Sequence, residues 1–434
     1  MRNSILGIIL ILVVLLQFLN QLFFEVPIII MSGIILLSFL IVDEKLLIGL
    51  YCFYIPVSVP IILYLVNIVF VIVLLFKLRH NIKFSSTIFY VLLISLIESI
   101  HVYVNINAGK DESIINLLGF ILCLIPFIFI NSISSKIDKL ATLKLFFVGF
   151  FSFTIIMFGK YYVEYGTFNI FNNVQRFGFS TNEGDMNNNE LLLNPNTIGV
   201  YSALIVAIII VLQKFKVINN NLIVWFMFSY AILIGLLTVS RTFLLIITVL
   251  FLLYLFSSII KKNIISFFVG VGLFIAALMV FLSNTQLSRT IHARLFESDD
   301  ISGSRFLIYK EYLNVIFSNE NIFLIGVGMQ DYLEKVKDFN YAINQSTHNM
   351  ILETLVIWGI LGLISVLCLF ISLIYNSHFW LENSFSDSLI KLFPIIVVIL
   401  SAQFGQYFIS FYHTFSITLL ALVYLSIKEG VRDD

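Results

Sequence analysis

The chain has 434 residues, of which 60% are hydrophobic and only 12% are charged. An ordinary soluble domain reaches about 45–50% apolar residues even when glycine is counted among them, so this composition excludes a water-soluble globular protein. The formal net charge is zero, and no basic excess favours nucleic acid as a partner.

Long apolar runs separated by short polar segments recur along the whole chain. A helix needs about 20 residues to cross the hydrocarbon layer, so these runs predict membrane-spanning helices. We expect them near residues 5–19, 26–42, 46–76, 87–104, 114–130, 142–159, 195–213, 221–239, 242–260, 264–282, 349–375, 389–406 and 411–427. In the run 46–76, Pro56 and Pro60 could split one segment into two short helices or kink one long helix. The predicted fold is an all-α integral membrane protein, a polytopic bundle of 12 to 14 transmembrane helices forming a single domain over residues 1–434.

Basic residues in the short connections predict the orientation of the helices, because positively charged segments resist translocation. Inner loops are expected where lysine and arginine gather, near residues 77–83, 136–144, 214–216 and 261–262, and at both termini. Alternation of the helices then puts two long loops, residues 160–193 and 283–347, on the extracytoplasmic side. We expect the polar functional residues in these loops, because irregular backbone exposed to lipid is excluded from the hydrocarbon layer.

The second long loop is expected to contain a short amphipathic helix. Ser302 or Ser304 is a good N-cap, and an apolar stripe at helical spacing follows, formed by Phe306, Tyr309, Leu313, Ile316 and Phe317. The stripe could lie on the membrane or on the mouth of the bundle. Further along, Gly326-Val327-Gly328 predicts a turn. Without a strand before it and a helix after it, this turn does not indicate a nucleotide-binding loop.

Five of the eight arginines fall on the outer side of this topology, against the orientation bias: Arg176, Arg241, Arg289, Arg294 and Arg305. The planar guanidinium suits bidentate phosphate binding, so the pattern indicates a phosphorylated ligand that approaches from the outer leaflet. For Arg289 and Arg294, the alternative is that they pair with Glu297, Asp299, Asp300 and their neighbours or simply contact water and headgroups.

Two of these arginines occupy distinctive positions. Arg241 lies between two apolar runs with almost no loop, which puts its charge at the membrane surface, where it either serves function or snorkels to headgroups. Arg305 falls in the first turn of the expected loop helix, where the helix dipole repels a cation but favours an anion. A diphosphate between the dipole and the guanidinium would resolve that conflict. The alternative is an exposed arginine on a loop helix.

His348 and Glu353 stand at the outer entry of the long run 349–375. We expect the imidazole of His348 in the first helical turn, where its near-neutral pKa suits a general base. A polar cap at the membrane surface is the alternative. Glu353 is either a buried partner or a surface charge.

Short motifs in this region resemble a known family. THNMILE at 347–353 and WGILG at 358–362 resemble the His-Asn-x-x-Leu-Glu and Gly-Ile-x-Gly pattern of the O-antigen ligase and Wzy-type polymerase superfamily. In that superfamily the pattern opens the span after the large periplasmic loop. Upstream, similar stretches are NPNTIG at 194–199, SRT at 240–242, and SGSR at 302–305 with GVG at 326–328. The resemblance covers roughly residues 190–375 and follows the family's order.

The resemblance implies glycosyl transfer from a polyprenyl diphosphate donor, with inversion at the anomeric carbon and with neither metal nor cofactor. Carried over by position, Arg241 and Arg305 would hold the diphosphate, and His348 would deprotonate the acceptor hydroxyl or orient the diphosphate. Further polar residues near these motifs would contact substrate: Arg176, Asn194, Asn196, Asn349, Glu353, Arg289 and Arg294.

We therefore expect a bacterial cytoplasmic membrane protein that polymerises undecaprenyl-diphosphate-linked oligosaccharide repeat units into O-antigen or capsular polysaccharide, with its site facing the periplasm or cell exterior. Membrane lipids, a flippase and a chain-length regulator of the same pathway are the expected partners. One alternative is a ligase that transfers the glycan to a different acceptor. A second is a lipid-linked oligosaccharide flippase or other transporter, although transporters usually carry their polar groups near the bilayer midplane and often show internal repeats.

Overall fold

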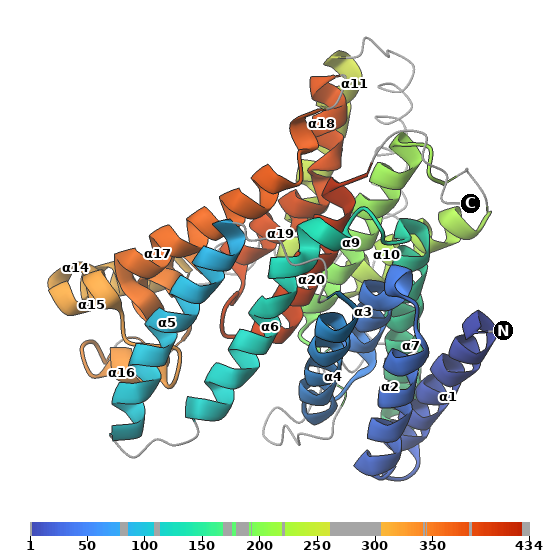
Figure 1. Cartoon of the computed structure of the whole chain (residues 1–434), viewed down its shortest axis with the longest axis horizontal. Helices are drawn as coiled ribbons and strands as arrows, with labels where there is room; N and C mark the ends of the chain where they lie inside the picture. Colours follow the sequence, from blue (N-terminus) through green and yellow to red (C-terminus); the bar gives the residue numbers. More distant parts are fainter. Residues whose placement is uncertain are drawn as a thin grey trace.

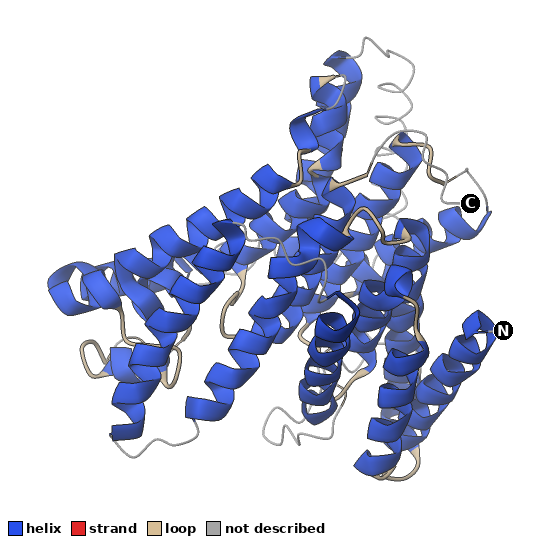
Figure 2. Ribbon diagram, in the orientation of Figure 1, coloured by secondary structure: helices blue, strands red, loops and turns tan. Residues whose placement is uncertain are grey.

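The computed structural model describes residues 2–78, 86–107, 113–167, 176–178, 191, 193–218, 222–260, 305–341, 343, 345–381 and 384–427. Within these residues every regular element is a helix and no strand is present (Figure 2). The helices are α1 (Arg2–Leu22), α2 (Ile28–Ile41), η1 (Glu44–Leu46), α3 (Leu47–Val57), α4 (Pro60–Leu78), α5 (Ser86–Asn107), α6 (Ser113–Ile133), α7 (Lys139–Tyr165), α9 (Pro195–Lys214), α10 (Leu222–Leu237), α11 (Arg241–Ile260), α14 (Arg305–Ser318), α15 (Glu320–Ile325), α16 (Tyr332–Lys337), α17 (Met350–Asn376), η3 (Phe379–Leu381), α18 (Phe385–Lys391), α19 (Phe393–Phe404) and α20 (Phe411–Leu425).

The described residues include eight helices that are long and apolar enough to cross a membrane: α1, α4, α5, α6, α7, α9, α11 and α17. Helices α18 and α19 are bent by 52° at their junction and form a ninth span if they are taken together. The predicted all-α polytopic membrane protein is therefore confirmed. The total of 12 to 14 spans stays a prediction, because the expected span at 264–282 lies outside the described residues.

The ambiguous run 46–76 is split into two helices that fold back on each other. Helix α3 ends at Val57, and Pro60 begins α4, where its missing N–H costs nothing. Across this hairpin, Tyr51 stacks on Phe70 with ring centroids 4.1 Å apart, and its hydroxyl donates to Asn67 Oδ1 at 2.6 Å. Because the paired residues lie at similar distances from the turn, α3 and α4 are antiparallel.

One end of the bundle collects lysines, and we name it the lysine end. Lys77 Nζ donates to the carbonyl of Val42, which joins the last turn of α4 to the end of α2. The N–H of Asp138, the N-cap of α7, donates to the carbonyl of Lys45 at 3.1 Å. The basic residues Arg79, Lys83, Lys261, Lys262, Lys428 and Arg432, which also supported the orientation, lie outside the described residues.

The opposite end carries Arg176, Arg241 and Arg305, and we name it the arginine end. Helix α7 runs from the lysine end toward it, and the hydroxyl of Tyr161, near the end of α7, accepts the N–H of Gly178 at 2.8 Å. Helix α7 continues to Tyr165, so the first residues of the expected loop 160–193 are helical. In the second expected loop, the described part holds three short helices, α14, α15 and α16, rather than one.

Helices α14, α15 and α16 lie beside α5 and α17 on one flank of the bundle (Figure 1). Helices α5 and α17 pack antiparallel: Thr87 Oγ1 lies 3.1 Å from Ser372 Oγ, and Trp358 Nε1 donates to Glu98 Oε2 at 2.6 Å. This pairing fixes α17, which carries the candidate site at its beginning.

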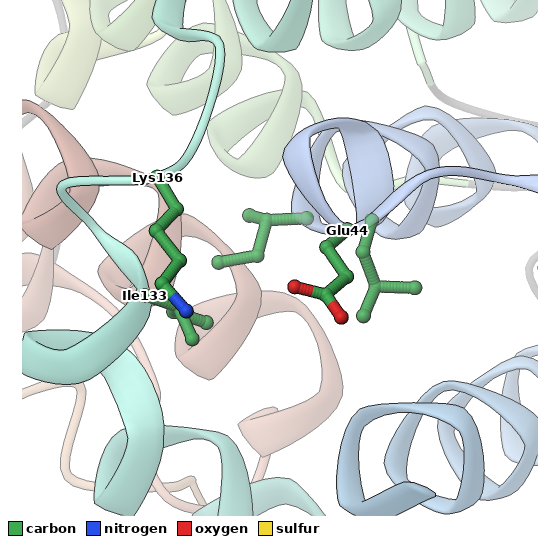
Figure 3. A pocket seen from close by; sticks show the side chains of 5 residues that line it. Glu44, Ile133 and Lys136 are labelled. Carbon is green, nitrogen blue, oxygen red and sulfur yellow. The ribbon is translucent and has the colours of Figure 1, made fainter. Parts of the chain in front are cut away.

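A small hollow opens at the lysine end, between η1, α3 and the end of α6 (Figure 3). Its lining consists of Glu44, Leu47, Ile48, Ile133 and Lys136. The side chains of Glu44 and Lys136 lie on opposite sides of it (Figure 3). None of the expected site residues lines this hollow, so the candidate site is built elsewhere.

Candidate functional site

The site is organised around the beginning of α17. Asn349 is the N-cap: its Oδ1 accepts the N–H groups of Ile351 and Leu352 at 3.0 and 3.1 Å. His348 therefore precedes the helix, and the expectation that it lies in the first helical turn is wrong. Its backbone has φ of 48°, a left-handed conformation that costs energy for a non-glycine residue. The surrounding contacts hold His348 in this strained geometry.

Arg305 lies half-buried against the connection between α19 and α20. Its Nη2 donates to the carbonyl of Phe404 at 3.1 Å, and its guanidinium carbon lies 5.6 Å from the centre of the Phe404 ring. Within the described part of the chain, Arg305 forms no ion pair. Burial lowers the pKa of Arg305, and the charge of Arg241 also lowers it, while Tyr309 acts in the opposite direction. The structure therefore brings two guanidinium groups close enough to repel each other.

His348 shares this electropositive environment. Burial lowers the pKa of His348 below its ordinary value, and the positive charge of Arg305 lowers it further. The imidazole is consequently held in its neutral form near neutral pH. Its Nε2 lies 3.5 Å from Ser346 Oγ. A neutral imidazole near the Arg305 cation can accept a proton during a reaction.

Arg176 and Asn196 brace the connection that carries Arg241. Arg176 donates from Nε to the carbonyl of Thr238 and from Nη2 to Asn196 Oδ1, each at 3.0 Å, and is only 5% exposed. Ser240 Oγ donates to the same Asn196 oxygen at 2.9 Å. Both residues were expected to contact substrate. The structure shows them binding each other and fixing Ser240, which directly precedes Arg241, and their contact with substrate stays a prediction.

Asn194 is the N-cap of α9, and its Oδ1 accepts the N–H of Asn196 at 2.9 Å. Its side chain is nevertheless exposed, so a contact with substrate stays a prediction. The other two expected site residues of the second loop, Arg289 and Arg294, lie outside the described residues, as do Ser302 and Ser304.

Glu353 is completely buried and does not face the site. Its carboxylate accepts three backbone N–H groups, from Tyr407 at 2.7 Å, Phe408 at 3.0 Å and Ile409 at 2.8 Å. A buried carboxylate is tolerated only with such compensation. The sequence left open whether Glu353 is a buried partner or a surface charge, and the buried partner is correct. Its carboxylate holds the α19–α20 connection in position rather than contacting substrate.

Sequence reasoning missed two glutamines of that connection. Gln403 Oε1 accepts from Asn349 Nδ2 at 3.1 Å, and Gln406 Nε2 donates to Ser346 Oγ. Tyr309 adds weak contacts from its hydroxyl to the carbonyls of His348 and Gln403, both at 3.4 Å. The sequence signal that could have identified these glutamines is the occurrence of two polar residues at the end of the apolar run 389–406.

The expected turn Gly326-Val327-Gly328 docks on a break inside α17. The N–H groups of Val327 and Gly328 donate to the carbonyls of Val356 and Ile357 at 2.9 and 2.8 Å. The break is at Gly359, whose φ is 64°. A Cβ at Gly326 would meet the carbonyl oxygen of Ile357 at 2.3 Å, so only glycine permits this approach. The turn therefore supports the half of α17 that begins at the site.

A carboxylate that sequence reasoning also missed, Glu98 of α5, holds the same break. It accepts Trp358 Nε1 at 2.6 Å and the N–H of Met329 at 3.3 Å. It is 2% exposed, and α5 is one of the helices long enough to span a membrane. Glu98 and Glu353 thus fix the first half of α17 from two sides.

The apolar stripe predicted on α14 is divided between two surfaces. Ile316 is buried and Tyr309 is half-buried, whereas Phe306 and Phe317 are 77% and 70% exposed. The buried face is completed by Tyr312, whose hydroxyl donates to the carbonyl of Gln345 at 2.9 Å. One part of the stripe therefore packs on the bundle, and the other part forms an exposed apolar face.

Comparison with known proteins matches the middle of this chain to one family. Residues 222–367 fit the family model described as O-antigen ligase. The match runs from α10 into α17 and spans Arg241, Arg305 and His348, about a third of the chain. No curated protein matches the chain. The resemblance noted in the sequence is confirmed.

Proposed function

We propose that this chain, whose residues 222–367 match the O-antigen ligase family model, polymerises polyprenyl-diphosphate-linked oligosaccharide repeat units on the outer face of a bacterial cytoplasmic membrane. The protein has several helices long enough to cross a membrane, and its match to the O-antigen ligase family model favours a glycosyltransferase-like enzyme. The product would be O-antigen or capsular polysaccharide. The reaction would be an inverting glycosyl transfer that needs no metal.

The observation that carries this proposal is the closeness of Arg241 and Arg305. The positive charge of Arg241 lowers the pKa of Arg305, so the two cations are costly to keep together, and a polyanion between them removes that cost. A diphosphate fits the planar donors of two guanidinium groups. It is also a good leaving group, so neutralising its developing charge and orienting an acceptor supplies most of what the reaction needs.

In the proposed step, the acceptor hydroxyl oxygen attacks the anomeric carbon of the donor from the face opposite the diphosphate. The bond between that carbon and the diphosphate oxygen breaks, the configuration inverts, and polyprenyl diphosphate leaves. His348, kept neutral by burial and by Arg305, is suited to take the proton of the acceptor hydroxyl. Orienting the diphosphate is its alternative role, because a bound anion would raise the pKa of the imidazole.

The distribution of cations supports the outward orientation of the site. Lysines gather at the end of the bundle opposite Arg176, Arg241 and Arg305, and lysine-rich loops are retained in the cytoplasm. The arginine end would then face the periplasm or cell exterior, where lipid-linked repeat units are joined.

Two other functions compete with polymerisation. A ligase would use the same diphosphate site and a different acceptor, and the family description itself names a ligase. We prefer the polymerase because chains rich in isoleucine, phenylalanine and asparagine resemble members of surface-polysaccharide clusters, which is an analogy. A transporter is less favoured because the arginines lie at helix ends rather than near the midplane.

Binding of polyprenyl diphosphate to the purified protein in lipid nanodiscs tests the proposal. Arg305→Ala should weaken binding on the order of 10- to 100-fold, as expected for a lost charge-assisted bond. Arg305→Lys should be nearly as damaging, because an ammonium keeps the charge and loses the fork. Lys310→Ala is the matched control, since Lys310 is exposed on the same helix. Equal affinity of the wild type and Arg305→Ala would refute the diphosphate site.

A further inference from the structure

The connection between α19 and α20 presents two amide side chains at the site, Gln403 and Gln406. Both are partly exposed. Each is anchored through one half of its amide: Gln403 Oε1 accepts from Asn349 Nδ2 at 3.1 Å, and Gln406 Nε2 donates to Ser346 Oγ. Ser346 and Asn349 flank His348 in the chain, so the two anchors lie on either side of the candidate base.

The other half of each amide remains available. Among the described residues, neither Gln403 Nε2 nor Gln406 Oε1 has a hydrogen-bond partner, and neither atom is completely buried. Gln403 therefore offers a donor and Gln406 offers an acceptor. Both groups have an orientation set by the anchored half of the same planar amide.

The connection itself is held rigidly against the arginine. Arg305 Nη2 donates to the carbonyl of Phe404, and the carboxylate of Glu353 accepts the N–H groups of residues 407–409. Groups fixed in this way pay little ordering cost when a ligand binds. The two amides thus have a defined position relative to Arg305 and His348.

We propose that Gln403 and Gln406 bind hydroxyl groups of the acceptor sugar and so determine which acceptor is used. This inference rests on the proposed glycosyl transfer. A sugar hydroxyl both donates and accepts, which matches an oriented donor beside an oriented acceptor. The amides are anchored to the residues that flank His348, and the base must face the acceptor. A site built to hydrogen-bond a hydroxyl discriminates strongly against a ligand that lacks it.

The experiment separates acceptor from donor. The donor is the lipid-diphosphate-linked repeat unit extracted from the source cells, and the acceptor is the same glycan freed from its diphosphate by mild acid, which can accept but cannot donate. Gln403→Met and Gln406→Met remove the amides at similar side-chain length. Each should raise the acceptor KM about 10-fold or more and leave the affinity for polyprenyl diphosphate within about twofold of the wild type. Gln330→Met is the matched control, because Gln330 lies on the α15–α16 connection and bonds Asn116 instead.

The outcomes are distinguishable. An unchanged acceptor KM in both variants would overturn the role of the glutamines. A parallel loss of polyprenyl diphosphate binding would also overturn it, since the amides would then only support the fold of the site. If the wild type binds polyprenyl diphosphate but forms no glycosidic bond with this acceptor or with the donor alone, the proposed transfer itself fails.

Discussion

Replacing Glu353 should destabilise the protein more than any surface acid. The buried carboxylate accepts N–H groups of Tyr407, Phe408 and Ile409 at 2.7, 3.0 and 2.8 Å. Each buried donor left without a partner costs about 1–3 kcal/mol, so Glu353→Ala should lose at least about 3 kcal/mol. In Glu353→Gln, one oxygen can still accept from Phe408 and Ile409, but an amide NH₂ meets the N–H of Tyr407. The expected loss there is about 1–3 kcal/mol.

Thermal unfolding in detergent, followed by tryptophan fluorescence, measures this order. The Tm should fall most for Glu353→Ala, less for Glu353→Gln and hardly at all for Glu334→Ala, because Glu334 is exposed on α16. Glycosyl transfer should fall in the same order even where the protein is folded, since the connection that holds Arg305 through Phe404 would shift. A Tm of Glu353→Ala equal to that of Glu334→Ala would refute the reasoning.

Three further predictions concern the reaction and the orientation. Because burial and Arg305 lower the pKa of His348, the neutral base should persist as pH falls, and the acid limb of kcat/KM should have its midpoint below the ordinary value of 6.5. The His348→Ala variant should lose this limb and turn over about 10²- to 10⁴-fold more slowly. An unaltered pH profile in that variant would exclude His348 as the base. Turnover should survive excess EDTA, whereas a complete loss that magnesium restores would contradict a site built on arginines. A cysteine at the exposed Tyr341 should react with an impermeant thiol reagent in whole cells and one at the exposed Lys136 should not, and the reverse labelling would place the arginine end in the cytoplasm.

Local sequence signals predicted the elements of this fold well. Apolar runs located the helices because the length of a span is set by the membrane and not by tertiary contacts. Proline marked the break between α3 and α4 because its ring excludes a continuous helix there. The same signals could not decide whether the two halves fold back, since that depends on contacts such as Tyr51 with Phe70.

The partners of the site residues were beyond local reasoning. Glu98 and Trp358 meet although they are 260 positions apart, and Glu353 binds backbone N–H groups, which leave no mark on the sequence of the connection. His348 was expected in the first helical turn, but it lies before the helix, because Asn349 is the N-cap and Met350 is the first helical residue. The structure brings Arg305 near Arg241 and near His348, whereas Arg176 and Asn196 brace the connection that carries Arg241.

The most direct test of the account is the product formed by the purified protein from a lipid-diphosphate-linked repeat unit. We predict a ladder of lengthening lipid-linked glycans, with one polyprenyl diphosphate released for each new bond. The ladder should disappear in Arg305→Ala. A single transfer to an unrelated acceptor would replace the polymerase with a ligase, and the absence of any covalent product from every donor offered would contradict glycosyl transfer altogether.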